Sequence, residues 1–123
     1  MTRKPFHHID LPPDLAQAAI DLREYYVESV AWTRSDALKL LEHLANGGAP
    51  VLGGDVLSSV KPLSYAYANW HTDPLPDEDV PSYAARSRRA ARDYIERYPS
   101  EPAWFVLVLG KPAAPSKRSP NER

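Results

Sequence analysis

Two segments decide the fold of this chain: APVLGGDVL at residues 49–57 and LSYAYANW at residues 63–70. The first is typical of a strand interrupted by two glycines, a pattern that marks a bulge or a close approach by another backbone. The second alternates large and small side chains, as a strand with two different faces does. One face would hold Leu63, Tyr65, Tyr67 and Asn69, and the other Ala66, Ala68 and Trp70. We expect the two strands to pair antiparallel across residues 58–62.

A third strand is predicted by AWFVLVL at residues 103–109, which Gly110 ends. This run has no alternation of polar and apolar side chains, so it favours a central strand that is covered on both faces. The segment at residues 25–32 is aromatic and β-branched, and it fits either a short strand or an apolar connector.

Two long helices are indicated by apolar stripes at helical spacing. Residues 34–46 follow Thr33, a good N-cap, and end at Gly47-Gly48, where glycine enters the left-handed conformation at low cost. Residues 83–97 follow Ser82 as the expected cap and end before Pro99. A shorter helix is predicted from Pro13 to about residue 23.

The order of these elements predicts an α+β fold. We expect a small, three- to four-stranded, mostly antiparallel sheet packed with two long helices and one short N-terminal helix. Residues 12–110 would form a single domain, flanked by a loose N-terminus at residues 1–11 and a disordered basic tail at residues 111–123.

Composition excludes several classes of protein. The chain has 123 residues, 43% of them hydrophobic and 25% charged, which is typical of a folded globular domain. It has no cysteine, so it cannot use disulfides, zinc thiolates or a cysteine nucleophile. No apolar run reaches the ~18–20 residues of a membrane span, and residues 1–8 do not resemble a signal peptide. We therefore expect a cytoplasmic protein that does not bind membranes.

Charge is distributed unevenly along the chain. Residues 1–80 carry twelve acidic and six basic side chains, whereas residues 81–123 carry nine basic and four acidic ones. Such asymmetry concerns partners rather than fold. The loop DPLPDED at residues 73–79 has four acids and no base, and it fits either a solvated loop or a surface for a basic partner.

Motifs for catalysis or cofactor binding are not found. The four histidines form none of the spacings typical of metal sites, and the glycine pairs precede no phosphate-binding helix. No serine stands in a nucleophile elbow. We therefore expect no metal, no cofactor and no enzymatic activity.

One constellation is more specific than the rest. Asp55 follows the two glycines, while Asn69 and Trp70 end the strand expected to pair with them. These residues fit either a partner-binding surface, where tryptophan is a frequent anchor, or a structural bulge with Trp70 in the core.

Four blocks in this order resemble the immunity protein 40 family of bacterial polymorphic toxin systems. They are the helix start at residues 32–38, the PVLGGDV block, the Tyr-Ala-Asn-Trp block, and Tyr83, Ser87 and Ala90 before the run at residues 93–98. Leu57 and His71 depart from the aromatic residues that the family pattern has there.

The resemblance implies a protein that binds a cognate toxin domain and blocks its active or binding surface, without catalysis of its own. We expect the toxin-facing surface to comprise Asp55, Asn69, Trp70, His71, Asp73, Asp77, Glu78 and Asp79. The alternative is a small nucleic-acid-binding domain that uses the basic helix at residues 83–97 and the basic tail.

Overall fold

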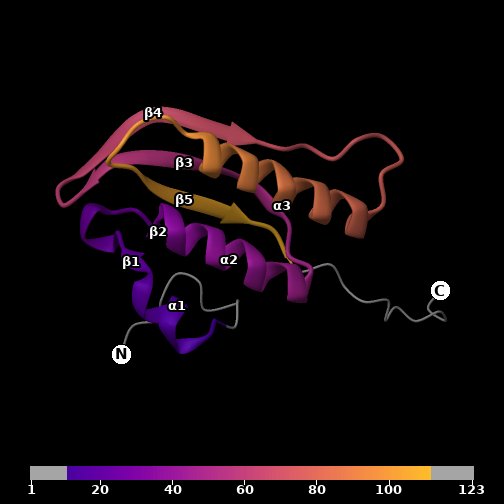
Figure 1. Cartoon of the computed structure of the whole chain (residues 1–123), viewed down its shortest axis with the longest axis horizontal. Helices are drawn as coiled ribbons and strands as arrows, with labels where there is room; N and C mark the ends of the chain where they lie inside the picture. Colours follow the sequence, from indigo (N-terminus) through magenta and orange to yellow (C-terminus); the bar gives the residue numbers. More distant parts are fainter. Residues whose placement is uncertain (1–10, 112–123) are drawn as a thin grey trace.

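The computed structural model describes residues 11–111, which build one five-stranded antiparallel sheet with two long helices on one of its faces (Figure 1). The strand order is β1-β2-β5-β3-β4. In chain order the elements are α1 (Pro13–Ala18), β1 (Ile20–Asp21), the 3-10 turn η1 (Arg23–Tyr25), β2 (Val30–Thr33), α2 (Arg34–Gly47), β3 (Val51–Val60), β4 (Leu63–His71), α3 (Val80–Arg97) and β5 (Trp104–Leu109). The α+β prediction is confirmed, and two short N-terminal strands bring the sheet to five.

The N-terminal segment differs from its prediction. Helix α1 ends at Ala18 instead of about residue 23, because Ala19 is already extended and the next two residues form β1. Ile20 pairs with Ala31, which also identifies the ambiguous segment as containing a strand, β2. Strand pairing has therefore overridden the local helical spacing.

Helix α2 forms as predicted. The Thr33 hydroxyl accepts the backbone N–H of Asp36 at 3.2 Å, which caps the helix N-terminus. Gly48 takes the left-handed conformation at the C-terminus, with φ 77°, and its N–H donates to the carbonyl of Leu44.

Helix α3 begins three residues earlier than predicted. Its N-cap is Asp79 rather than Ser82, and the Asp79 carboxylate accepts the N–H of Ser82 at 2.7 Å. Pro81 sits in the first turn, where its missing N–H costs nothing. Ser82 therefore donates its N–H to the N-cap residue and is not itself the N-cap.

The hairpin of β3 and β4 confirms the predicted antiparallel pairing. Asp55 pairs with Asn69 and Gly54 with Trp70, and the register is irregular nearer the turn, around Leu57. The glycines do mark a close approach: a methyl group on Gly53 would lie 2.9 Å from Cα of His71 and would overlap with the Trp70 carbonyl oxygen.

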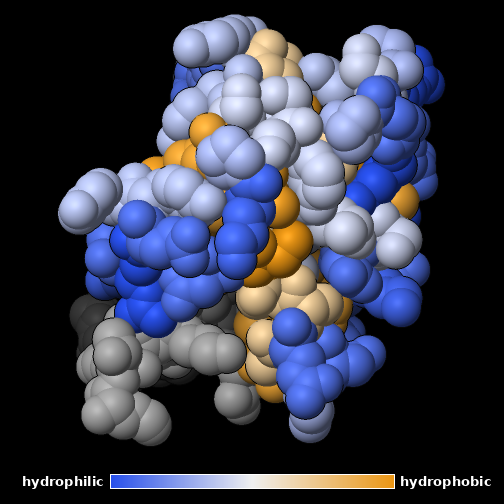
Figure 2. Space-filling view, turned by 90° about the vertical axis from the view of Figure 1, so that its left-hand side faces the viewer, coloured by the Kyte–Doolittle hydropathy of each residue, from blue (hydrophilic) through white to orange (hydrophobic). Residues whose placement is uncertain are grey.

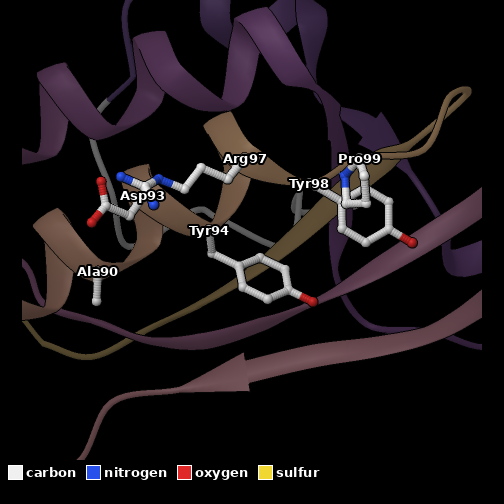
Figure 3. Close-up of a pocket in the computed structure, with 6 residues that line it drawn as sticks. All are labelled: Ala90, Asp93, Tyr94, Arg97, Tyr98 and Pro99. Atoms are coloured by element: carbon white, nitrogen blue, oxygen red, sulfur yellow. The ribbon is translucent and has the colours of Figure 1, made fainter.

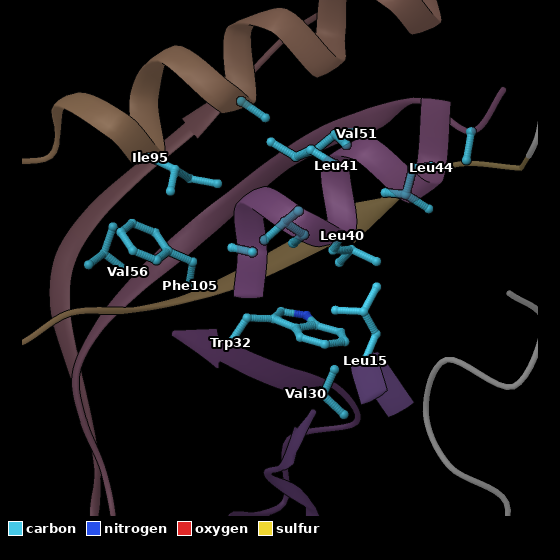
Figure 4. Packing of buried hydrophobic residues seen from close by; sticks show 14 of the residues in the cluster. Leu15, Val30, Trp32, Leu40, Leu41, Leu44, Val51, Val56, Ile95 and Phe105 are labelled. Carbon is cyan, nitrogen blue, oxygen red and sulfur yellow. The ribbon is translucent and has the colours of Figure 1, made fainter. Parts of the chain in front are cut away.

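The main hydrophobic core lies between the sheet and the helices (Figure 4). Trp32 and Phe105 are its largest fully buried side chains, and leucines from α1 and α2 pack with them. Ser87, the one buried polar residue among those described, accepts the N–H of Val51 at 2.9 Å and so ties α3 to the start of β3.

Residues 11–111 cover the second face of the sheet at one end only. There Leu22 packs with Ala31, Leu57 and Val106 in a smaller cluster. Figure 2 views this end of the molecule, where hydrophobic side chains reach the surface between hydrophilic flanks. At the other end Val108 is 48% exposed, so β5 is central, as predicted, but covered on both faces along only part of its length.

The predictions for the chain ends fall mostly on residues that the structure does not describe. The loose N-terminus was expected at residues 1–11 and the basic tail at residues 111–123, and only Leu11 and Lys111 of these belong to the described part.

Candidate partner-binding surface

Three of the predicted site residues share the face of the sheet that carries no helices. Asp55 and Asn69 are direct partners across β3 and β4, and His71 pairs with Gly53 two residues along. Residues paired in this way point to the same side of a sheet. Asn69 and His71 are exposed and Asp55 is half-buried, so this end of the β4 strand offers polar groups to solvent.

Trp70 lies on the opposite face, apart from Asn69 and His71. Its ring stacks on Tyr94 of α3, with centroids 4.6 Å apart. A methyl group on Gly54 would come within 2.8 Å of ring atom Cζ3, so the ring lies directly over the glycine backbone. Trp70 is therefore held between Gly54 and Tyr94, which gives the glycine and the tryptophan a packing role.

The four acids of the loop at residues 73–79 fall into two groups. Glu78 is held by Arg86, whose Nε and Nη2 each donate to its carboxylate at 2.8 Å. This pairing, together with the N–H of Leu75, lowers the pKa of Glu78 to about 2. The hydrogen bonds from Ser82 likewise lower the pKa of Asp79, the cap of α3. Both carboxylates thus serve the fold.

Asp73 and Asp77 remain exposed on the same loop. Two contacts from α3 brace the start of the loop: the Tyr83 hydroxyl donates to the carbonyl of Thr72 at 2.6 Å, and Arg86 donates to the carbonyl of Asp73 at 2.7 Å. His71 Nε2 stands 3.8 Å from Oδ2 of Asp73. The structure therefore brings His71 and Asp73 together and presents two carboxylates on a fixed loop.

A groove on α3 is a feature that the sequence analysis missed. It has a volume of about 560 Å³ and is lined by Ala90, Asp93, Tyr94, Arg97, Tyr98 and Pro99. Figure 3 shows the two tyrosine side chains reaching from α3 toward the neighbouring strands. Both tyrosines belong to the apolar stripe of the predicted helix, and both are half-buried. They line a groove because Tyr94 packs on Trp70 of β4 and Tyr98 on Phe105 of β5, contacts that spacing along the helix does not encode.

The basic side of α3 is largely engaged by the protein itself. Arg86 is paired with Glu78, Arg92 stands 3.6 Å from Glu96, and Arg88 donates to the carbonyl of Ala49 at 2.8 Å. Arg88, Arg89 and Arg92 line a second groove of about 350 Å³ between α2 and α3, which Glu42 also lines. Burial and the neighbouring Arg89 lower the pKa of Arg88. Three of the five arginines on α3 are thus engaged within the fold, while the basic tail, on which the nucleic-acid alternative also depends, lies mostly outside the described residues.

Residues 11–111 contain neither a cluster of metal-binding side chains nor a helix that could cross a membrane. No three histidine or carboxylate side chains in this range gather closely enough to hold a metal ion. Within the same range, none of the helices has the length and apolar character that a bilayer crossing requires.

Comparison with known proteins identifies the family of this chain. Neither the curated proteins nor the solved structures gave a match. The model of the family described as "Immunity protein 40" does match, over residues 21–109. These residues run from the last residue of β1 to the end of β5 and include the Gly54–Trp70–Tyr94 packing and the braced acidic loop. Because the match covers well over half of the sequence, this chain belongs to the immunity protein 40 family.

Proposed function

We propose that the protein binds a cognate bacterial toxin domain in the cytoplasm of the toxin-producing cell and neutralises it by occlusion, without catalysis of its own. Membership of the immunity protein 40 family supports a toxin as the partner. Binding alone suffices for this function, because a protein that covers an active or substrate-binding surface needs no reaction centre.

The toxin-facing surface in this proposal is the end of β4 together with the acidic loop. Exposed Asn69 and His71 lead directly into Asp73, and Asp77 follows on the same braced loop. A toxin that acts on nucleic acid has a basic active surface, because that surface must hold phosphates. Opposite charges steer two proteins toward each other and raise the association rate.

The single observation that supports this surface is that the four acids of the loop have two different roles. Glu78 and Asp79 hold the loop and the helix start, so their charges are used within the fold. Asp73 and Asp77 stay exposed and are held in place by that framework. A surface for a charged partner needs this combination of exposure and fixed position.

The sharpest test exchanges Asp73 and Asp77 for asparagine. Asparagine keeps the size of the side chain, and it tolerates the left-handed conformation of Asp77, whose φ is 64°. We expect the association rate with the toxin domain to fall about five- to tenfold at low salt, and the salt dependence to become shallower. Asp14→Asn is the matched control, because it removes an exposed carboxylate on α1, away from the loop (Figure 1).

Two outcomes would count against the proposal. An association rate at low salt equal to that of Asp14→Asn would remove the loop from the binding surface. Failure of the unaltered protein to rescue cells that express the toxin encoded by the neighbouring reading frame would refute toxin neutralisation itself. Rescue by the unaltered protein, and weaker rescue by the double variant at low expression, is the expected result.

A further inference from the structure

The outer edge of β4 presents backbone hydrogen-bonding groups to a partner. Among the strands of residues 11–111, β4 is the last in the sheet order and has only β3 beside it. The N–H of Thr72 donates to the carbonyl of Leu52 at 3.0 Å, so the backbone groups of Thr72 point inward to β3. Backbone direction alternates along a strand, and therefore the N–H and C=O groups of His71 and Asn69 point outward.

The side chains of this edge lack the charges and prolines that usually protect against strand addition. Exposed edges in natural proteins are commonly short or carry lysine, other charges or proline. β4 has nine residues, from Leu63 to His71, and none of them is lysine, arginine, aspartate, glutamate or proline. Irregular register near Leu57 and the positive φ of Tyr67 disturb the half nearer the turn. The regular half, residues 68–71, is thus the part that a new strand can pair with.

A groove for a side chain lies beside the same part of the strand. Tyr94, which lines the 560 Å³ groove, stacks on Trp70 of β4. Tyr98 continues the lining one helical turn further along and packs edge-on against Phe105 of β5, so Tyr94 is the ring of the groove that contacts β4 (Figure 3). The lining is mostly aromatic and aliphatic, with Asp93 and Arg97 as its two charged members, so it suits one large apolar side chain.

The chemistry of the neighbouring loop defines the rest of the partner segment. Asp73 follows the outward-facing His71 by two residues and is exposed. A segment paired along residues 69–71 therefore brings its end next to a carboxylate, which favours a lysine or arginine there.

We propose that the toxin docks through an extended segment that adds a sixth strand to the outer edge of β4 at Asn69 and His71. The segment inserts an apolar or aromatic side chain into the Tyr94–Tyr98 groove and places a basic residue beside Asp73. This inference rests on the proposed function, because it takes the toxin as the partner. Main-chain hydrogen bonds supply affinity in such an arrangement, and the groove and the carboxylate supply specificity.

The first test compares two substitutions at one position. His71→Ala removes the side chain and keeps the outward N–H, whereas His71→Pro removes that N–H as well without breaking a bond to β3. We expect proline to weaken toxin binding about tenfold or more relative to alanine. Equal affinity of the two variants would overturn the added strand, while binding by both would leave the proposed function intact.

The second test fills the groove. Ala90→Phe places a ring among the lining residues, and Ala85→Phe makes the same change on α3 in the second groove. We expect the affinity for the toxin domain to fall about tenfold or more for Ala90→Phe and less than about threefold for Ala85→Phe. Circular dichroism of both variants checks that α3 is intact. Unchanged affinity of a folded Ala90→Phe variant would exclude the groove.

A third measurement needs no substitution and also covers the case in which His71→Pro does not fold. No strand of the described part of the chain lies beside the outward amides of Asn69 and His71, so we expect them to exchange readily with solvent in the free protein. In the complex of the full chain with the toxin domain we expect their exchange to slow by about tenfold or more. A complex that forms while both amides exchange as in the free protein would refute strand addition and would still support toxin binding.

Discussion

Gly54→Ala is the substitution that most directly tests the packing at the centre of this fold. The added methyl group would lie 2.8 Å from Cζ3 of Trp70 and would overlap with the carbonyl oxygen of Val106. Carbon atoms in contact prefer ~3.5–4.0 Å, so the ring must withdraw by about 1 Å. It has little room to do so, because Tyr94 stacks on the ring at a centroid distance of 4.6 Å.

The expected loss of stability follows from two opposing terms. Overpacking of this kind costs ~1–3 kcal/mol. The methyl group meets both the Trp70 ring and the Val106 carbonyl oxygen, so we place Gly54→Ala at the upper end of that range. Replacing glycine by alanine returns about 0.4–1 kcal/mol through the lower entropy of the unfolded chain. We therefore expect the free energy of unfolding to fall by about 2 kcal/mol, which corresponds to roughly 8 °C in the melting temperature.

The assay is urea unfolding followed by tryptophan fluorescence and circular dichroism, with Gly47→Ala as the control. A methyl group on Gly47 meets no atom within 4 Å, and the residue ends helix α2, so this exchange should stabilise the protein by about 0.5 kcal/mol. Gly54→Ala in a Trp70→Leu background should lose about half of its penalty, because the Val106 carbonyl still blocks the methyl group. If Gly54→Ala proves as stable as Gly47→Ala, the argument from close packing fails.

Three further substitutions test other contacts. Arg34→Met removes a guanidinium whose Nη1 donates to the Ile95 and Tyr98 carbonyls at the end of α3; we expect a loss of about 2–3 kcal/mol in thermal unfolding, and a loss below about 0.5 kcal/mol would contradict this role. Because Arg86 and the N–H of Leu75 together lower the pKa of Glu78 from 4.5 to about 2, these contacts stabilise the fold above about pH 4.5, and their contribution is lost as the pH falls toward 2; Glu78→Gln should flatten that part of the pH profile of unfolding, and an unaltered profile would show that the contacts do not contribute. Ser87→Ala leaves the N–H of Val51 buried without its acceptor and should cost about 1–3 kcal/mol in urea unfolding, whereas a neutral result would mean that the N–H finds another partner.

Local sequence signals were sufficient where the structure depends on neighbours along the chain. The cap at Thr33, the stripe of leucines after it and the glycine at position 48 define α2 without reference to other elements. The β3–β4 hairpin is similar, because the two strands are consecutive and pair across a short turn. The N-terminal segment is different: residues 20–21 become a strand only because β2 offers an edge to pair with, and helical spacing does not reveal that edge.

The candidate surface could be predicted only as a region. The sequence marks the loop at residues 73–79 as acidic, and it gives its four carboxylates equal standing. The structure separates them, because α3 begins at Val80 and so makes Asp79 a cap, and because Arg86 reaches back eight residues to Glu78. The same holds for Trp70, whose direction depends on which face of β4 the helices cover.

The residues that resemble the family's motifs have structural roles in this fold. The glycine pair and Trp70 are accounted for by close packing against each other and Tyr94. Ser87 is accounted for by its hydrogen bond to Val51. Motifs with such roles specify the sheet and its helices, and they carry no information about one particular toxin. Under the proposed function, we expect selectivity among toxins to depend on exposed positions that these packing roles do not involve, such as His71 and the nearby Asp73. Exchanging these positions between family members should transfer toxin preference, whereas exchanging the glycines should only change stability.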